Sequence, residues 1–157
     1  MLGVKLQPFP TLNAHGLLDP GIYDLSLLQI ESIFGKFQRT DRRLNLFRKL
    51  TALVEEVGGY DFASHLIVDG SFITSKDEPS DIDIIFVVKE GTLPLDTMIN
   101  PYEYNALSAR RLKKKYDFDV LVVNENSETY NHYVQYFSRV KEGPNDIRKG
   151  LVRLELK

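Results

Sequence analysis

Two carboxylates on one predicted strand are the residues of this sequence best suited to chemistry. Asp81 and Asp83 are separated by one residue and begin an apolar run that continues to Val88. Alternate residues of a strand point to the same face, so both carboxylates would project together. Like charges at the mouth of an apolar strand repel and lose hydration, which costs several kcal/mol if they are buried unpaired. Mg²⁺ would remove that cost, since it favours one or two protein carboxylates with water and substrate phosphates.

A third acid that would complete this set begins another apolar run. Asp119 precedes the apolar residues 120–123, as Asp83 precedes the apolar part of its own strand. If the two strands are neighbours, Asp119 forms a triad with Asp81 and Asp83. Asp117 lies on the same face as Asp119 by parity and is the rival candidate. Asp119 is preferred because it lies deeper in the strand.

The segment upstream of the acid pair has the composition of a phosphate-binding loop. Gly70-Ser71 directly follows a short apolar run. Glycine lets a phosphate approach the backbone, and serine offers both a hydroxyl and an amide. Lys76, within the loop, is a candidate for the triphosphate, and Ser80, directly before the acids, is counted with the nucleotide-binding residues. The plain alternative is a strand-to-loop turn followed by solvated acids. The spacing from Gly70-Ser71 and the later Asp119 favours the site.

Three further groups of side chains are weaker candidates. Arg110 or Arg111 could be aimed at a triphosphate, because the planar guanidinium suits phosphate oxygens. For the lysines at 113–115, stabilisation of the negative end of a helix dipole is favoured over a role in binding phosphate. Tyrosines at helical spacing are typical of a core and its rim, with a stacking platform for a base as the alternative: Tyr130, Tyr133 and Tyr136.

Alternating strands and helices are needed to bring these residues together. The patterns predict strands at 66–68, 81–88, 118–123 and 151–156. They predict helices at 25–38, 41–57, 100–115 and 127–137. Residues 1–23, which contain Pro8, Pro10 and Pro20, are expected to form an extended N-terminal arm. The alternation predicts an α/β fold, a single domain over 1–157 with a mixed sheet of about four strands flanked by helices.

The bulk composition narrows the classes of function and location. The 157 residues suit one core of ordinary size, and a formal net charge of −2 argues against nucleic acid as a partner. The absence of cysteine excludes disulfides, thiol catalysis and zinc-thiolate sites. No apolar run has the length of a membrane span, and the first residues lack the pattern of a secretory signal. A cytoplasmic protein without a membrane partner is therefore expected.

Two segments of the sequence resemble a known enzyme signature. Residues 66–72 (Leu-Ile-Val-Asp-Gly-Ser-Phe) and 80–86 (Ser-Asp-Ile-Asp-Ile-Ile-Phe) resemble the Gly-Ser … Asp-x-Asp motif of the polymerase-β-like nucleotidyltransferase superfamily. Nearly the whole chain is similar to a small bacterial family of nucleotidyltransferase-like proteins of unknown function. The segments that carry this second resemblance are 18–23, 42–43, 110–112 and 148–152.

The resemblance implies a nucleotidyltransferase-like fold and a metal-dependent transfer of a nucleoside monophosphate. The donor would be a nucleoside triphosphate, with ATP and transfer of AMP expected first. Asp81 and Asp83 would bind Mg²⁺ or Mn²⁺, and Asp119 would hold the metal nearer the nucleophile and help to remove its proton. Gly70 and Ser71 would hold the phosphates.

The resemblance also bears on the acceptor. Template-dependent and RNA-modifying members carry extra domains for their acceptor, and 157 residues leave no room for one. The acceptor is therefore expected to be a separate protein or small molecule. Minimal members often occur as antitoxin partners, so a toxin or defence effector is the expected protein partner. The alternative is a catalytically inactive nucleotidyltransferase-fold module that binds or neutralises such a partner.

Overall fold

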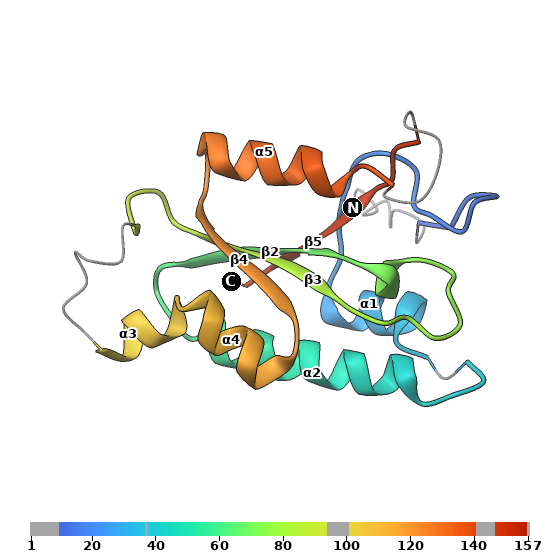
Figure 1. Cartoon of the computed structure of the whole chain (residues 1–157), viewed down its shortest axis with the longest axis horizontal. Coiled ribbons are helices and arrows are strands. Elements are labelled where there is room, and N and C mark those ends of the chain that lie inside the picture. Colours follow the sequence, from blue (N-terminus) through green and yellow to red (C-terminus); the bar gives the residue numbers. More distant parts are fainter. Residues whose placement is uncertain (1–9, 37, 94–100, 141–146, 157) are drawn as a thin grey trace, which may run out of the picture.

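A five-stranded mixed sheet with the order β1-β5-β2-β3-β4 lies at the centre of the molecule (Figure 1). The structure is a computed structural model that describes residues 10–36, 38–93, 101–140 and 147–156. The strands are β1 (Ile22–Asp24), β2 (Ala63–Asp69), β3 (Asp83–Val88), β4 (Asp119–Asn124) and β5 (Leu151–Glu155). The helices are α1 (Leu27–Phe34), α2 (Arg42–Val57), α3 (Pro101–Ala106), α4 (Ala109–Tyr116) and α5 (Glu128–Phe137), with a 3-10 turn η1 (Ser71–Ile73).

Strand directions follow from the connections between them. β2 pairs antiparallel with both β3 and β5, whereas β3 pairs in parallel with β4. A parallel pair requires a crossover, and α3 and α4 lie in the connection between β3 and β4. β1 pairs in parallel with β5 at one edge of the sheet. The predicted α/β fold with a mixed sheet flanked by helices is confirmed.

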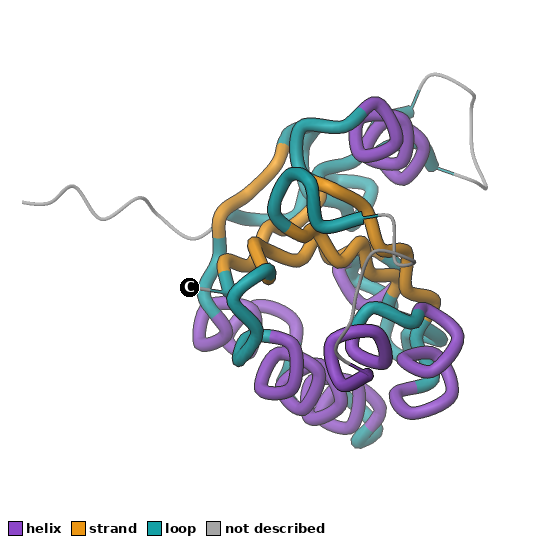
Figure 2. The backbone as a smooth tube through the Cα atoms, turned by 90° about the vertical axis from the view of Figure 1, so that its left-hand side faces the viewer, coloured by secondary structure: helices purple, strands orange, loops and turns teal. Residues whose placement is uncertain are grey.

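The helices divide unequally between the two faces of the sheet. α1, α2 and α4 pack on one face around the larger core, and α5 alone covers the other face (Figures 1 and 2). Leu66 and Val68 of β2 belong to the larger core, while Ile67 and Ile85 contact the α5 side. Since side chains alternate along a strand, Asp69 and Asp83 share the α5 face with those isoleucines. The acids at the ends of β2 and β3 therefore point away from the main core.

The sheet has one strand more than the sequence predicted, because part of the expected arm pairs with β5. Ile22 is the register partner of Leu151, and the Gly150 amide donates to the Leu18 carbonyl at 2.9 Å. A Cβ at Gly150 would lie 2.4 Å from the carbonyl oxygen of Asp19, so only glycine allows this approach. The extended conformation was predicted, but its hydrogen-bonding partner lies about 130 residues further along the chain and leaves no local signal.

β2 begins three residues before the predicted strand 66–68, and three other predicted elements differ from the structure by more than one residue. The predicted helix 100–115 is two helices, because Ser108 caps α4 by accepting a hydrogen bond from the Arg111 amide. Asn100, the expected cap, lies outside the described residues, and α3 begins at Pro101. The predicted helix 25–38 ends at Phe34, although its capping box of Ser26 and Gln29 is confirmed.

The third difference concerns the acid pair itself. The strand predicted for 81–88 begins at Asp83. The Asp81 carbonyl accepts a hydrogen bond from the Phe72 amide at 3.2 Å, so this residue pairs with the turn η1 rather than with β2. Asp81 and Asp83 therefore occupy different backbone environments, and strand parity alone does not describe their relative orientation.

Candidate active site at the end of the sheet

Two adjacent arginines hold the loop that joins β2 to β3. Arg43, only 2% exposed, donates to the carbonyl oxygens of Phe72 at 2.6 Å and Thr74 at 2.6 Å, and also to those of Phe34 and Lys76. Arg42 donates to the carbonyls of Pro79 and Ser80 at the other end of the loop. Both arginines come from the first turn of α2. The start of α2 therefore fixes the course of residues 70–81.

Gly70 makes the tight turn with which this loop begins. Its φ of +94° lies in a region that side chains with a Cβ rarely adopt. A Cβ there would also lie 2.9 Å from the Asp81 carbonyl oxygen and 3.0 Å from the Asp83 amide. Two backbone segments thus come as close as glycine permits, which brings Ser71 next to the acids.

Ser71 is bonded directly to the first of the two acids. The Asp81 Oδ1 atom accepts from the Ser71 amide at 3.1 Å and from the Ser71 hydroxyl at 3.0 Å. The Ser80 amide donates to the Ser71 Oγ atom at 2.9 Å. The three polar residues form one hydrogen-bonded group, in which Ser71 orients the Asp81 carboxylate.

Three aspartates form a row across the end of the sheet. In the strand register Asp83 is paired with Asp69 of β2 on one side and with Asp119 of β4 on the other. Register partners have neighbouring side chains on the same face of a sheet. The neighbouring strands required for Asp119 to join the site are therefore present, and Asp69 adds an acid that the sequence analysis did not propose.

A lysine neutralises the acid at each end of the row. The Lys149 Nζ atom lies 2.7 Å from Asp69, and these side chains are 14% and 4% exposed. The Lys113 Nζ atom lies 2.6 Å from Asp119, where both side chains are more than 60% exposed. The hydrogen bond to Asp119 raises the pKa of Lys113 above its usual value. The buried pair is a fixed part of the structure, whereas the exposed pair is screened by water.

The row opens into two adjoining cavities that share Asp83 and Phe137. The central cavity, of about 400 Å³, is bounded by two acids of the row, by Asp81, by residues of the β2–β3 loop and by cations from other segments. Those residues are Asp69, Gly70, Ser71, Lys76, Asp81, Asp83, Arg139 and Lys149. The β4 cavity, of about 470 Å³, has Asp119, Arg110, Lys113 and Asp83 on its walls.

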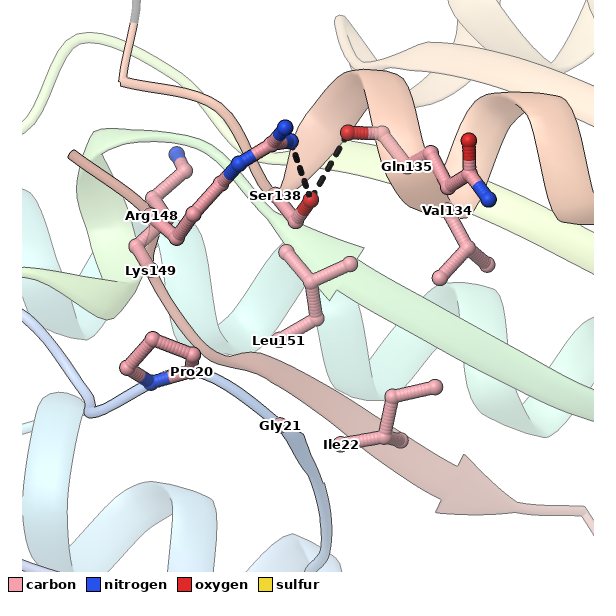
Figure 3. A pocket seen from close by; sticks show the side chains of 9 residues that line it. All are labelled: Pro20, Gly21, Ile22, Val134, Gln135, Ser138, Arg148, Lys149 and Leu151. Carbon is pink, nitrogen blue, oxygen red and sulfur yellow. Dashed lines mark hydrogen bonds between the residues drawn. The ribbon is translucent and has the colours of Figure 1, made fainter. Parts of the chain in front are cut away.

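A third cavity of about 470 Å³, here the β1–β5 cavity, lies on the far side of Lys149. It is formed between α5 and the β1–β5 edge of the sheet, and Lys149 also lines the central cavity (Figure 3). All three volumes fall within the range of about 300–1,000 Å³ that is typical of small-molecule sites.

Most residues proposed from the sequence come together in this region. Gly70, Ser71, Lys76, Asp81 and Asp83 line the central cavity, Asp119 lines the β4 cavity, and Ser80 bonds to Ser71. The sequence analysis missed Asp69 and Lys149. It also missed the hydrogen bonds by which Arg42 and Arg43 hold the loop. An acid immediately before Gly70-Ser71 was a usable signal for Asp69. No local signal links it to Lys149, 80 positions later.

The weaker candidates have different outcomes. Arg111 forms a bidentate pair with Glu56 of α2 at 3.0 Å, so of the two candidate arginines it is not the one that lies at the acid row. Arg110 lines the β4 cavity. Asp117 ends α4 in the left-handed conformation with a φ of +62°, outside β4, so it does not share the strand face of Asp119.

The tyrosines of α5 form no common platform. Tyr130 and Tyr133 pack against the smaller core, whereas Tyr136 is 52% exposed. Tyr130 also meets His65 edge-on at 5.9 Å between ring centroids. Of the two interpretations given for these tyrosines, packing in the core describes Tyr130 and Tyr133, and the structure shows no stacking platform formed by all three.

Hard carboxylate oxygens make the acid row chemically suited to Mg²⁺ or Mn²⁺. Within the described residues, however, no three His, Cys, Asp or Glu side chains are gathered closely enough to hold a metal ion. Asp81 is turned toward Ser71 and Asp119 toward Lys113. The residue types and backbone positions fit a divalent cation, while the side chains are engaged elsewhere.

In the described part of the chain, no helix has the length and apolar character needed to cross a bilayer. The longest helix is α2, with 16 residues.

Comparison with known proteins gives one match. No curated protein and no solved structure matches the chain. A family model described as a family of unknown function, DUF6932, matches residues 10–155. This match includes every element of the sheet and all the residues of the acid row. The chain therefore belongs to the DUF6932 family.

Proposed function

We propose that the protein is a metal-dependent nucleotidyltransferase with a nucleotidyltransferase-like fold. It would transfer a nucleoside monophosphate, AMP first among them, from a nucleoside triphosphate to a hydroxyl of a separate acceptor, with release of pyrophosphate and of the hydroxyl proton. The observation that carries this proposal is the paired register of Asp83 with Asp119, beside a glycine-serine loop that ends at Asp81. These features place carboxylates, a backbone approach for phosphate and a cavity within one region.

Each part of the site has a role that its position suits. To bind a metal, Asp81 would turn away from Ser71, to which it is now bonded. The released Ser71 amide and hydroxyl, with Lys76 and Ser80 near them, would bind phosphate oxygens of ATP or another nucleoside triphosphate. Gly70 would let those oxygens approach the backbone. The Asp119 carboxylate, exposed on the wall of the β4 cavity, would accept a proton from an acceptor hydroxyl that enters there.

Asp81, Asp83 and Asp119 would hold Mg²⁺ or Mn²⁺. A bound divalent cation would neutralise charge on the phosphates and polarise the phosphorus that is attacked. To take part, Asp119 would leave Lys113, and this exchange costs little because both side chains are exposed. Lys113 would then be released toward the substrate side of the same cavity.

The test is transfer of label from each nucleoside triphosphate labelled at the α-phosphate. Purified protein is incubated with each triphosphate, Mg²⁺ or Mn²⁺, and a lysate of its host. We expect a labelled acceptor with the wild type, none with the double variant Asp81→Asn/Asp83→Asn, and none with Asp119→Asn. Transfer that survives the double variant would show that the chemistry lies elsewhere.

Asp117→Asn is the matched control. It removes a carboxylate two positions from Asp119, and asparagine tolerates the left-handed conformation found there. Transfer should be unchanged. If Asp117→Asn abolished transfer while Asp119→Asn did not, the rival third acid would be the correct one.

A second function is favoured by the two lysines of the acid row. Because Lys149 and Lys113 already neutralise Asp69 and Asp119, the domain could be an inactive module that binds a toxin or defence effector. Its test is protection of cells from an effector encoded beside this gene. Protection by the triple variant of Asp81, Asp83 and Asp119 to asparagine would support the inactive module, and loss of protection would support catalysis.

A further inference from the structure

The β1–β5 cavity is walled largely by apolar side chains. Ile22 and Leu151 rise from neighbouring strands toward α5, and Val134 points back at them from the helix (Figure 3). Pro20 closes the end near Lys149. Ile22 is 41% exposed, which is unusual for a large apolar residue of this protein. The slot thus has apolar surfaces that the described chain does not cover.

Gln135 is the uncharged polar side chain of the cavity that remains available for a ligand. The Ser138 hydroxyl donates to the Gln135 carbonyl at 2.7 Å, and it accepts a long contact of 3.5 Å from Arg148 (Figure 3). Gln135 also lines the cavity, and its exposed side-chain amide bonds to no other residue that the structure describes. An amide offers both donors and an acceptor, the pattern needed to read the edge of a heterocycle.

The cavities follow the order of the strands. The β1–β5 cavity lies over β1 and β5, the central cavity lies at the ends of β2 and β3, and the β4 cavity adjoins β4. Val134 and Gln135 line the first cavity, and Phe137 lines the other two, so the C-terminal half of α5 spans all three. Lys149, held by Asp69, joins the first cavity to the second.

The geometry points to the β1–β5 cavity as the binding site for the nucleobase of the nucleotide, with Gln135 as the residue that reads the base. This inference rests on the proposed function, which assigns the phosphates to the central cavity. The base then occupies one of the two flanking cavities. The apolar side chains of Ile22, Val134 and Leu151 suit the faces of a flat ring, and the Gln135 amide suits its edge. Of the two cations that also line the cavity, Arg148 and Lys149, the second faces the central cavity as well and is placed to meet the phosphates. The β4 cavity carries Asp83, Asp119, Arg110 and Lys113 and suits the acceptor.

Binding of two probes separates the base from the phosphates. Affinities for each Mg²⁺–nucleoside triphosphate and for Mg²⁺–tripolyphosphate are measured by calorimetry. Gln135→Ala should weaken binding of the preferred nucleotide about 10-fold, while tripolyphosphate binds as to the wild type. The difference in affinity between bases should shrink by a similar factor. Ile22→Ala, which shortens the wall, should weaken nucleotide binding less and leave tripolyphosphate unaffected.

Asn131→Ala is the matched control, because it removes an exposed amide from the same helix outside the cavity. It should change neither affinity. Nucleotide binding that is tighter than tripolyphosphate binding but unaltered by Gln135→Ala would overturn the assignment of the base and leave the proposed function standing. Failure of both probes to bind the wild type would overturn the function and this inference together.

Photolabelling provides an independent measurement. A nucleoside triphosphate with an azide on the base should attach to the peptide that contains residues 134–138 or to residues 148–151, as read by mass spectrometry. Competition by unlabelled nucleotide should remove the label. Competable labelling confined to residues 109–121 would place the base in the β4 cavity and overturn the inference.

Discussion

At the scale of single residues, side chains at the end of the sheet position the backbone by hydrogen bonds in addition to supplying charge. Arg43 is buried and charged, and its partners are carbonyl oxygens rather than a carboxylate. Burial lowers its pKa, which shows that the surroundings do not fully replace hydration. The guanidinium still donates to four carbonyls, and its contacts with those of Phe34 and Phe72 are buried. It therefore organises the loop that holds Ser71.

Replacement of Arg43 by methionine should destabilise the protein strongly. Methionine fills much of the volume but leaves buried carbonyls unsatisfied, at about 1–3 kcal/mol each. The free energy of unfolding, measured in urea, should fall by about 3 kcal/mol or more. Arg48→Met on the exposed side of the same helix should change it by about 0.5 kcal/mol at most. Equal effects of the two substitutions would contradict the role given to Arg43.

Gly70 and Gly91 offer a comparison between backbone strain and close approach. Both have positive φ, at +94° and +83°, but only Gly70 is crowded by the backbone of Asp81–Asp83, and a Cβ at Gly91 would meet open space. Gly91→Ala should therefore cost about 1 kcal/mol, from the backbone conformation alone. Gly70→Ala should cost more in urea unfolding and should also weaken tripolyphosphate binding. A smaller loss for Gly70 would show that the loop adapts freely.

At the scale of elements, α2 and α4 are joined by one carboxylate. Glu56 of α2 accepts from Arg111, Lys115 and Tyr116 of α4 at distances between 2.6 and 3.1 Å. The hydrogen bond from Arg111 is the main reason that the pKa of Glu56 falls to about 2. This contact fixes α4, which carries Arg110 and Lys113 to the β4 cavity.

The low pKa of Glu56 makes stability depend on pH. A carboxyl group with a depressed folded pKa stabilises the protein above its unfolded pKa of about 4.5 and loses that effect as pH falls toward about 2. Glu56→Gln should lower the free energy of unfolding by about 1–3 kcal/mol at pH 7. The difference from the wild type should shrink between pH 4.5 and 2. Glu55→Gln, an exposed neighbour, should show neither effect.

On the scale of the whole molecule, the sheet has the larger core on one face and the acid row on the other. The helix-rich face carries the larger core, and the α5 face carries the smaller core, the acid row and the three cavities. A ligand that binds along the α5 face would link β5, the β2–β3 loop and β4, which come from distant parts of the sequence. Binding should therefore stabilise the entire fold rather than one element.

Ligand-linked stability gives a prediction that needs no knowledge of the acceptor. A Mg²⁺–nucleoside triphosphate at about 100 times its Kd should raise the free energy of unfolding by about 2.7 kcal/mol. Differential scanning calorimetry should show a higher Tm, and EDTA should reverse most of the increase. The Asp81→Asn/Asp83→Asn variant should lose the Mg²⁺-dependent part. A nucleotide effect of the same size with and without Mg²⁺ would contradict a metal at the acid row.

By itself, the sequence determined the features that short-range periodicity encodes. The apolar runs of β2, β3 and β4, the α2 stripe and the capping box of α1 follow from local patterns, since strands and helices repeat every few residues. The types and spacing of Gly70, Ser71, Asp81 and Asp83 led to the chemistry that we propose. Only the tertiary structure decided which distant residues meet there. Asp69, Asp83 and Asp119 form a row because β2, β3 and β4 are adjacent in the sheet. Lys149 reaches Asp69 and Arg43 reaches the loop because packing, not local propensity, sets such contacts.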